Sequence, residues 1–495
     1  MKYVIAMDQG TTSSRAVVFD ETGRMVSAQG IEFPQIYPKP GWVEHDPKEI
    51  LESQVSALRL AVELSGIDVA DVESIGITNQ RETTLLWDRE TGEPLHNAIV
   101  WQCRRTAPIV ERLKRDGLGS IIKNRTGLIP DAYFSGTKLA WLLDTVAGAR
   151  ERAAQGRLLF GTVDSYLAFM LTKERRHVTD ATNASRTMLY NIFEGGWDAE
   201  LLRMLDIPPN LLPEVVDSSG VIGTLDKSIL GREIPIAALA GDQHAALYGQ
   251  GCFTPGMVKN TYGTGCFVLM NTGRTPVKSP EGLLTTVGWQ IDGKVTYALE
   301  GSVFVAGAAV KWLRDEMGLV KSAAETEALA TSVPDNAGVY FVPAFTGLGA
   351  PTWDMYARGL IVGLTRGAGR AHVVRAALES IAYQSADVIS EMQKESGISM
   401  PLLRADGGAS ANDFLMQFQA DILGAKVVRP AVIESTALGA AMLAARAVGL
   451  WTDADLQKIQ PSHRTFAPAM DGAMRERLTR QWKRAVARAC GWAEE

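Results

Sequence analysis

The sequence predicts an α/β fold of mixed sheets covered by helices, arranged as two similar domains. Apolar strand-like runs alternate with segments of helical periodicity along the chain. An opening pattern of strand, Gly10 turn and strand also returns halfway along, where VKNTYGTGCFVLMNTGR has a turn at 263–265. Chance recurrence of hairpin chemistry is the alternative. We expect domains at 1–250 and 251–495, because YGQGCFTPG between them concentrates three glycines and a proline.

Composition narrows the class of protein. The 495 residues are 46% hydrophobic, and at roughly 100 to 200 residues per domain they allow two to four domains. A net charge of -6 argues against a nucleic-acid or membrane-surface partner. The four cysteines lack CxxC spacing, and the chain shows neither a signal-peptide pattern nor a membrane-spanning run. We therefore expect a cytoplasmic protein with no membrane insertion.

Several helices can be placed from periodicity and capping residues. Ser135 is expected to be the N-cap of a helix whose apolar face carries Leu139, Leu142, Leu143 and Val146. A second helix is expected to begin near Ala371, with an apolar stripe that Ser385 interrupts.

Two further helices lie near the end of the chain. DFLMQFQADILG is expected to end at Gly424 as its C-cap. STALGAAMLAARAVG is expected to start with a capping pair and to end at Gly449. The small residues of this last segment predict close packing against a sheet.

The opening strands, KYVIA and RAVVF, are joined only by small polar residues. Gly10 permits a close backbone approach, and the hydroxyls of residues 11–14 are able to surround a phosphate. An ordinary hairpin, in which those residues satisfy their own backbone, fits the same residues. These residues alone do not decide between the two.

Familiar nucleotide-binding motifs are missing from the sequence. GxxxxGK[ST] does not occur, and no GxGxxG follows a strand and opens a helix. The remaining candidates are glycine-rich turns at strand ends, which begin at Asp8, Gly241, Gly263 and Asp406.

Those turns belong to a set of motifs in a fixed order: DQGTTSSR, ITNQRETT, NAIVWQCRRT, TGL with YFSGTK, GDQHAALYGQ, NTYGTGC, VPAFTGLGAP and DGGASANDFLMQFQADILG. From about residue 3 to residue 450, the set resembles the FGGY carbohydrate-kinase family of the actin and sugar-kinase superfamily, and within it the branch that phosphorylates glycerol. The resemblance implies two ribonuclease H-like domains flanking a catalytic cleft that holds ATP, Mg²⁺ and glycerol.

The resemblance also implies the nucleotide-binding residues. They would be Thr11, Thr12, Ser13 and Arg15 in the first hairpin, Thr264, Gly265 and Gly307 on the second domain, and Gly408 and Asn412 around the adenosine. A planar guanidinium suits phosphate oxygens. Lys311 stands where relatives commonly have glutamine, so that contact is not carried over.

The family pattern makes Asp242 the catalytic base that accepts the proton of the attacking hydroxyl, as phosphoryl transfer to an alcohol requires. Asp8 would hold Mg²⁺ through water, with Asp242 also at the metal. For His244, which follows in the same motif, we expect a structural role.

The resemblance places the glycerol pocket at residues with polar heads and aromatic walls. Arg81 and Glu82 would bond the two non-reacting hydroxyls, with Tyr133 and Gln243 as further polar partners. Trp101 and Phe267 would close on the carbon chain; without the resemblance, both are expected in the core.

The implied activity is ATP-dependent phosphorylation of glycerol to sn-glycerol 3-phosphate. Another FGGY kinase with a longer polyol or ketose substrate, and a non-catalytic ATP-binding switch of the actin type, are the alternatives. Relatives form homodimers or homotetramers, and the sequence does not choose between them. Some are inhibited by fructose 1,6-bisphosphate at a glycine-rich loop, whereas DKSILGREIP here has only Gly231 and Arg232.

Overall fold

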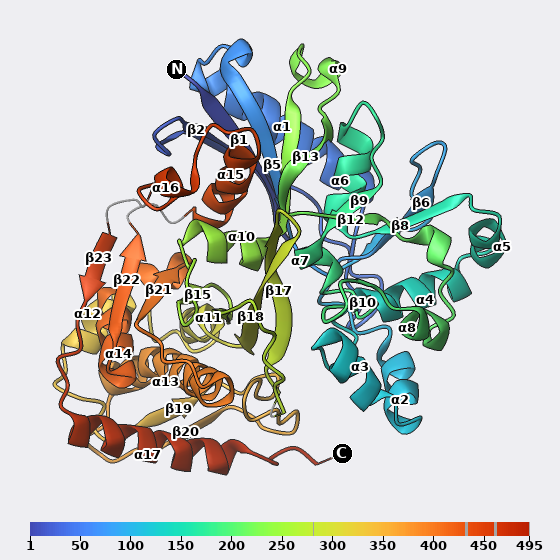
Figure 1. Ribbon diagram of the computed structural model, residues 1–495. Helices are drawn as coiled ribbons and strands as arrows, with labels where there is room; N and C mark the ends of the chain where they lie inside the picture. The colour runs from blue at the N-terminus through green and yellow to red at the C-terminus, as the bar shows by residue number, and fades with distance from the viewer. Residues whose placement is uncertain (281, 431–433, 460–462, 495) are drawn as a thin grey trace.

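A computed structural model describes residues 1–280, 282–430, 434–459 and 463–494. Two large mixed sheets form the cores of its two halves (Figure 1). In spatial order, the first sheet is β13 (Ser219–Thr224), β14 (Pro235–Gly241), β5 (Val72–Asn79), β1 (Tyr3–Gln9), β2 (Ser13–Asp20) and β3 (Met25–Glu32). The second is β17 (Leu284–Ile291), β18 (Lys294–Val303), β16 (Cys266–Gly273), β15 (Val258–Tyr262), β21 (Leu402–Asp406), β22 (Lys426–Pro430) and β23 (His463–Phe466).

The second sheet repeats the topology of the first and has one more strand, β17, paired with β18. In the first, the β1–β2 hairpin has antiparallel β3 on one side and the parallel strands β5 and β14 on the other. In the second, the β15–β16 hairpin is flanked in the same way by β18 and by β21 and β22. Each sheet adds an antiparallel strand beyond the parallel pair, β13 in one and β23 in the other. The recurrence of hairpins predicted from the sequence is therefore a true structural repeat; the boundary at residue 250 stays a prediction.

Long helices cover the sheets, and shorter elements connect them. The helices are α1 (Pro47–Ser65), α2 (Ala107–Arg115), α3 (Gly119–Thr126), α4 (Ser135–Thr145), α5 (Ala149–Ala154), α6 (Val163–Leu171), α7 (Ala181–Ala184), α8 (Ala199–Met204), α9 (Lys227–Leu230), α10 (Asp242–Gly249), α11 (Gly307–Asp315), α12 (Glu325–Thr331), α13 (Arg370–Ser396), α14 (Asp413–Leu423), α15 (Ser435–Ala447), α16 (Asp453–Leu456) and α17 (Gly472–Ala489). Three short 3₁₀ turns are η1 (Val69–Asp71), η2 (Pro209–Leu211) and η3 (Gly408–Ala411).

Five two-stranded sheets complete the described fold. They pair β4 (Glu44–His45) with β7 (Ala98–Ile99), β6 (Leu85–Asp88) with β8 (Leu158–Gly161), β9 (Val178–Asp180) with β12 (Glu214–Val216), β10 (Tyr190–Asn191) with β11 (Gly196–Trp197), and β19 (Tyr340–Val342) with β20 (Leu360–Val362). The first four are formed by residues 44–216 of the N-terminal half, and β6 and β8 lie on its outer side, beside α5 (Figure 1).

Helix α15 comes from the C-terminal half of the chain but packs on the first sheet, where it also crosses α10. The crossing is close because glycines face each other: a Cβ on Gly439 would lie 1.8 Å from the carbonyl oxygen of Ala245, and one on Gly249 would lie 2.1 Å from that of Ser435. On the sheet side, a Cβ on Gly76 would lie 2.2 Å from the carbonyl oxygen of Ala440. The prediction that this helix packs closely on a sheet is confirmed.

The helix caps were predicted less well than the helices. Ser135 is the first residue of α4 rather than its N-cap, which is Phe134, because its hydroxyl donates to the carbonyl of Glu82 instead. No side-chain cap is present at the start of α15, and that helix ends at Ala447, two residues before Gly449. The predicted side-chain caps at the starts of α4 and α15 are therefore both wrong, whereas Gly449, with a φ of 75°, directly follows the C-cap residue Val448. Gly424 does cap α14 in the left-handed conformation, as predicted.

The second predicted helix is α13, and its interrupted stripe has a structural reason. Ser385 is buried within the apolar face and accepts a hydrogen bond of 3.0 Å from the side-chain amide of Asn260 on β15. The hydroxyl thus joins α13 to the second sheet.

The structure bears on two composition-based expectations. All four cysteines are free thiols. Across the described ranges, we find no helix whose length and apolar character would suit it to cross a membrane.

Candidate functional site

The candidate site lies where the parallel strands of the first sheet end. Asp8 is the second-last residue of β1, Arg81 and Glu82 follow β5, and Asp242 directly follows β14. The carboxyl ends of neighbouring parallel strands meet at one edge of a sheet, which is where open α/β sheets bind ligands. Three motifs that lie far apart in the sequence are thereby brought together.

Asp242 opens helix α10, and its side chain is 30% exposed. Its Oδ1 is 3.1 Å from Nε of Arg81 and accepts the backbone N–H of Gln243 at 2.7 Å. Its Oδ2 accepts a bond of 3.2 Å from the side-chain amide of Gln243. The carboxylate is held by three donors yet keeps access to solvent, which suits a group that accepts a proton from a bound substrate.

Arg81 belongs to a buried cluster of two cations and two carboxylates. Its guanidinium donates two hydrogen bonds, of 2.6 and 3.1 Å, to Glu300 on β18. Arg186 bridges the cluster, with 2.6 Å from its Nε to Glu82 and 3.1 Å from its Nη2 to Glu300. None of the four side chains is more than 2% exposed. Burial opposes ionisation of Glu300, but the two guanidiniums hold its pKa well below the usual range.

The backbone at Glu82 is also unusual. Its φ of 59° lies in the left-handed region, which costs a residue with a side chain roughly 1–3 kcal/mol. Its carbonyl accepts hydrogen bonds from Ser135 at 3.0 Å and from Lys138 at 3.2 Å. Two side chains of α4 therefore hold this peptide in place, and the Glu82 carboxylate is directed toward Arg186.

The aromatic residues predicted for the acceptor pocket contact one another. The rings of Trp101 and Tyr133 are 5.7 Å apart, and those of Trp101 and Phe267 are 6.5 Å apart. The indole N–H of Trp101 donates to the hydroxyl of Thr11 at 3.0 Å. Each of the three rings is partly exposed, so the expectation that Trp101 and Phe267 would lie in the core is wrong. Through Trp101, these rings connect the hairpin that is predicted to bind phosphate with strand β16 of the second half.

Asp8 lies close to the carboxylate of Asp242. Burial and the negative charge of Asp242 raise the pKa of Asp8 to about 7. Asp8 also faces Arg15 across the hairpin, where the two residues are directly paired in the β1–β2 register. A pair of carboxylates beside a hairpin that is predicted to bind phosphate is a donor set that a hard divalent cation prefers.

The first hairpin turns tightly, with the N–H of Gly10 donating to the carbonyl of Ser13 at 3.0 Å. Thr11, Thr12 and Ser13 keep at least partial exposure. Ser14 is buried and bonded to Ser53 on α1 at 2.9 Å, so the inclusion of its hydroxyl in an anion cradle is wrong. Arg15 is 2.7 Å from Glu434, a carboxylate that a bound phosphate would have to replace.

The second hairpin turn packs on the N-terminus of α11. The N–H of Gly307 donates to the carbonyl of Gly263 at 3.0 Å, and that of Ala308 to the carbonyl of Thr264 at 3.1 Å. A Cβ on Gly265 would lie 2.3 Å from the carbonyl oxygen of Val303. These contacts bring Thr264, Gly265 and Gly307 together, as the phosphate role requires.

The residues predicted around the adenosine are adjacent to each other and to β15. Gly408 begins η3, and Asn412 caps α14 through a bond of 2.9 Å from the N–H of Leu415. The preceding Gly407 has a φ of 83°, and a Cβ there would lie 2.6 Å from the carbonyl oxygen of Tyr262. This close approach sets the 407–412 turn against the end of the second hairpin.

Three residues that the prediction set aside or left open have plain structural surroundings. His244 is buried, and burial together with the charge of Arg81 holds its pKa well below the usual range, in line with a structural role. Lys311 is exposed on α11. The guanidinium of Arg232 donates to the backbone carbonyls of Val69 and Ala70.

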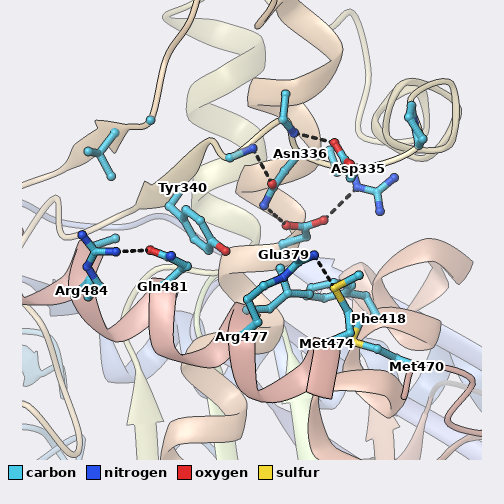
Figure 2. A pocket seen from close by; sticks show the side chains of 18 of the residues that line it. Asp335, Asn336, Tyr340, Glu379, Phe418, Met470, Met474, Arg477, Gln481 and Arg484 are labelled. Carbon is cyan, nitrogen blue, oxygen red and sulfur yellow. Dashed lines mark hydrogen bonds and ion pairs between the residues drawn. The ribbon is translucent and has the colours of Figure 1, made fainter. Parts of the chain in front are cut away.

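A groove of about 950 Å³ lies elsewhere, between α17 and the 334–338 loop (Figure 2). Its lining includes Arg477 and Arg484 of α17, and Glu379 of α13, whose carboxylate bonds Arg375 and Asn336. It includes none of the residues predicted from the motifs. We place the candidate site at the strand ends, where the carboxylates and the aromatic wall converge.

Sequence reasoning missed Arg186, Glu300 and Lys259, all buried near the predicted site. A signal was present for two of them: Lys259 is the one charged residue of β15, and Glu300 lies in the interior of β18 between Leu299 and Gly301. Charges in such positions are almost always paired. The partner of each charged residue depends on contacts between segments that are distant in the sequence, and no local pattern predicts those contacts.

Two sheets of one topology, with a phosphate-type hairpin on each and a strand-end carboxylate between them, define a two-domain phosphotransferase. The sequence model of the N-terminal domain of the FGGY family of carbohydrate kinases matches residues 3–249, and that of the C-terminal domain matches residues 258–448. The chain belongs to the FGGY family of carbohydrate kinases.

Individual relatives narrow the comparison. A glycerol kinase of Caldanaerobacter subterraneus subsp. tengcongensis is 61% identical over the full length of both chains. The crystal structure of Plasmodium falciparum glycerol kinase with ADP is 35% identical and has a TM-score of 0.94, covering 99% of this chain and 98% of that one. A ligand-bound xylulose kinase from Lactobacillus acidophilus is 26% identical with a TM-score of 0.88, over 98% and 97% of the two chains.

Proposed function

We propose that this kinase transfers the terminal phosphoryl group of ATP to glycerol, forming sn-glycerol 3-phosphate and ADP, the first step of glycerol catabolism. The observation that carries the proposal is the convergence of the acceptor residues. Asp242, Arg81 and the ring of Trp101 come from three separate segments of the first half, and Glu300 and Phe267 of the second half close on them. The relatives named glycerol kinase support the choice of acceptor.

The proposed reaction is an in-line displacement. The terminal hydroxyl of glycerol lies against Asp242, which accepts its proton as the new P–O bond forms and the bond to the bridging oxygen of ADP breaks. Arg81, Glu82, Tyr133 and Gln243 would hold the other hydroxyls. Because the carboxylate of Asp242 is fixed by Arg81 and by the N–H groups of Gln243, it needs no reorganisation when the hydroxyl arrives.

The nucleotide would lie between the two hairpins. Thr11, Thr12, Ser13 and Arg15 approach its phosphates from the first, and Thr264, Gly265 and Gly307 from the second. Gly408 and Asn412 would contact the adenosine. Arg15 would exchange Glu434 for phosphate oxygens, which are able to accept two parallel hydrogen bonds from a guanidinium.

The donor set fits Mg²⁺. Asp8 and Asp242 are two oxygen-donating carboxylates, and burial together with the negative charge of Asp242 raises the pKa of Asp8 to about 7. Mg²⁺ usually keeps several waters and takes one or two protein carboxylates. Asp8 would hold it through water, with Asp242 also at the metal, and the bound cation would neutralise charge on the phosphates.

The aromatic wall favours a small triol. The ring of Trp101 contacts those of both Tyr133 and Phe267 beside the polar residues, and such a wall is expected to leave little length for a longer chain. A five-carbon ketose or polyol is the alternative acceptor, because the fold is shared with a xylulose kinase.

The test is a coupled assay of ADP release from MgATP with glycerol, xylulose, gluconate or ribitol as acceptor. We expect the highest kcat/KM with glycerol. If the enzyme prefers a sugar over glycerol, that sugar becomes the proposed acceptor. ATP binding without acceptor-stimulated ADP release would favour a non-catalytic switch.

We also propose that the protein acts in the cytoplasm, without nucleic-acid or membrane partners, as a homodimer or homotetramer.

A further inference from the structure

A buried lysine lies behind the proposed base. Lys259 is on β15, has no exposed surface, and points from the second sheet toward helix α10. Its ammonium donates a hydrogen bond to the side-chain oxygen of Gln243 and another, of 3.0 Å, to the hydroxyl of Thr261. A buried ammonium is costly unless it is paired and hydrogen-bonded, so a lysine in this position is expected to have a specific task.

Lys259 determines which way the amide of Gln243 faces. An ammonium is a donor only, so it accepts no bond from the amide NH₂ and requires the amide oxygen on its side. The NH₂ group of Gln243 is then directed to the other side, where it donates to Oδ2 of Asp242 at 3.2 Å. With the amide turned over, its oxygen would face the carboxylate and repel it.

The carboxylates around Lys259 explain how its charge is tolerated. Burial lowers the pKa of Lys259 to about 8, while the negative charges of Asp406 and Asp242 oppose that shift. Asp406 ends β21, lies opposite Thr261 in the sheet register, and is itself buried. The charges of a buried carboxylate on the same sheet and of the proposed base thus both act on the lysine.

We propose that Lys259 is a positioning residue of the phosphoryl transfer, which orients Gln243 so that its amide donates to the catalytic carboxylate Asp242. The inference rests on the proposed function. Lys259 contacts neither the acceptor nor the nucleotide; it acts through Gln243. Because β15 leads directly into the 263–265 turn, the same residue ties the base on α10 to the strand that carries the nucleotide-side turn.

The experiment is a double-mutant cycle with Lys259→Met, Gln243→Met and the double variant, measured as kcat and as KM for glycerol and ATP. Each single change is expected to lower kcat by about tenfold or more, because Asp242 loses an oriented donor. The double variant is expected to lose no more than the worse single variant, since residues that act as one unit are not additive. The KM for ATP should change by less than about threefold.

Asn260→Ala is the matched control. Asn260 is the next residue of β15 and is equally buried, but its side chain bonds Ser385 on the opposite face of the sheet. This variant should lose thermal stability while kcat stays within about twofold of wild type. A Lys259→Met enzyme whose kcat is also within about twofold of wild type, or a cycle whose effects simply multiply, would overturn the proposal.

Gln243→Glu decides the matter if Lys259→Met does not fold. The carboxylate keeps a partner for Lys259 but removes the donor to Asp242, so kcat should fall as in Gln243→Met; wild-type kcat in this variant would exclude the proposed role. Wild-type protein that releases no ADP with glycerol would instead refute the function itself, which keeps the two failures distinct.

Discussion

Glu300 is the buried carboxylate on which two guanidiniums converge. It bonds Arg81 twice and Arg186 once, and its side chain has no exposed surface. Arg81 in turn reaches Asp242. A charge on the second sheet therefore fixes the position of a cation that contacts the proposed base on the first half.

Glu300→Gln tests this arrangement. Removing one partner of a buried ion cluster leaves uncompensated charge, so the free energy of unfolding should fall by about 3–5 kcal/mol. Urea denaturation without ligands measures it. Glu233→Gln is the control: Glu233 makes an exposed pair of 2.8 Å with Lys173, and its loss should cost about 1 kcal/mol or less. Equal losses in the two variants would contradict a structural role for the cluster.

At the residue level, the prediction of the site came from motifs. Asp8, Arg81, Glu82, Trp101, Tyr133, Asp242 and Phe267 were placed from the resemblance, and the structure gathers them in one region. Arg186 and Glu300 were missed because their partners lie more than a hundred residues away in the sequence. Ser14 was assigned to the wrong side of its strand, since alternation along β2 buries it against α1.

At the scale of elements, the crossing of α10 and α15 determines where the base lies. Asp242 begins α10, and the glycine contacts with α15 leave no room for a side chain between the two helices. A shift of this helix pair would move Asp242 relative to Arg81.

Gly439→Ala should therefore be costly. The added methyl would meet the carbonyl of Ala245 at 1.8 Å, and overpacking of this kind costs about 1–3 kcal/mol or more. Thermal unfolding should show a clear loss in Tm, with kcat lowered as well. Gly472→Ala, on the exposed first turn of α17 where nothing lies within 4 Å, should leave Tm unchanged or slightly higher. Wild-type Tm in Gly439→Ala would disprove the close crossing.

Helix α6 carries a buried carboxyl group, that of Asp164, whose pKa is raised. Asp164 is fully buried between Thr162 and Thr179, and burial raises its pKa from 3.8 to about 7. The native state therefore binds this proton more tightly than the unfolded state. Its contribution to stability is complete at low pH and is lost as the pH rises toward 7.

Asp164→Asn removes the titration. Relative to wild type, the variant should gain stability between about pH 5 and pH 7, by up to about 1.4 kcal/mol per pH unit. Urea denaturation at both values measures the gain. In Asp20, hydrogen bonds from Thr22 and Arg24 overcome burial and lower the pKa, so Asp20→Asn should differ from wild type equally at both values. A flat difference for Asp164→Asn would contradict the assigned pKa.

At the scale of the whole molecule, the site is built from both sheets. Phe267 and Glu300 of the second sheet contact Trp101 and Arg81 of the first half. Ligands that bind only the assembled site should stabilise the native state by mass action.

Glycerol and MgADP should each raise Tm, by amounts that grow with ligand concentration. Phe267→Ala should reduce the Tm shift produced by glycerol and leave the Tm shift produced by MgADP unchanged, because the substitution removes a ring from the glycerol pocket only. A thermal-shift titration of both proteins makes the comparison. Equal losses with the two ligands would place Phe267 outside the acceptor pocket.

The overall fold was more predictable than its details. The repeated hairpin predicted two similar sheets. A buried strand, a glycine turn and a second strand form a local pattern, which can be recognised in the sequence. The small residues of α15 predicted close packing on a sheet, but they did not predict that the first of the two sheets would be its partner. The caps of α4 and α15 failed because tertiary contacts took over the hydroxyl of Ser135 and left the start of α15 without a side-chain cap.

The most direct measurement is kcat for Asp242→Asn with saturating glycerol and MgATP, on protein whose Tm matches wild type. Asparagine keeps the shape but accepts no proton, and a positioned base contributes about 10² to 10⁴-fold. We predict a loss in that range. A loss smaller than about tenfold would contradict the assignment, because another group would then be removing the hydroxyl proton.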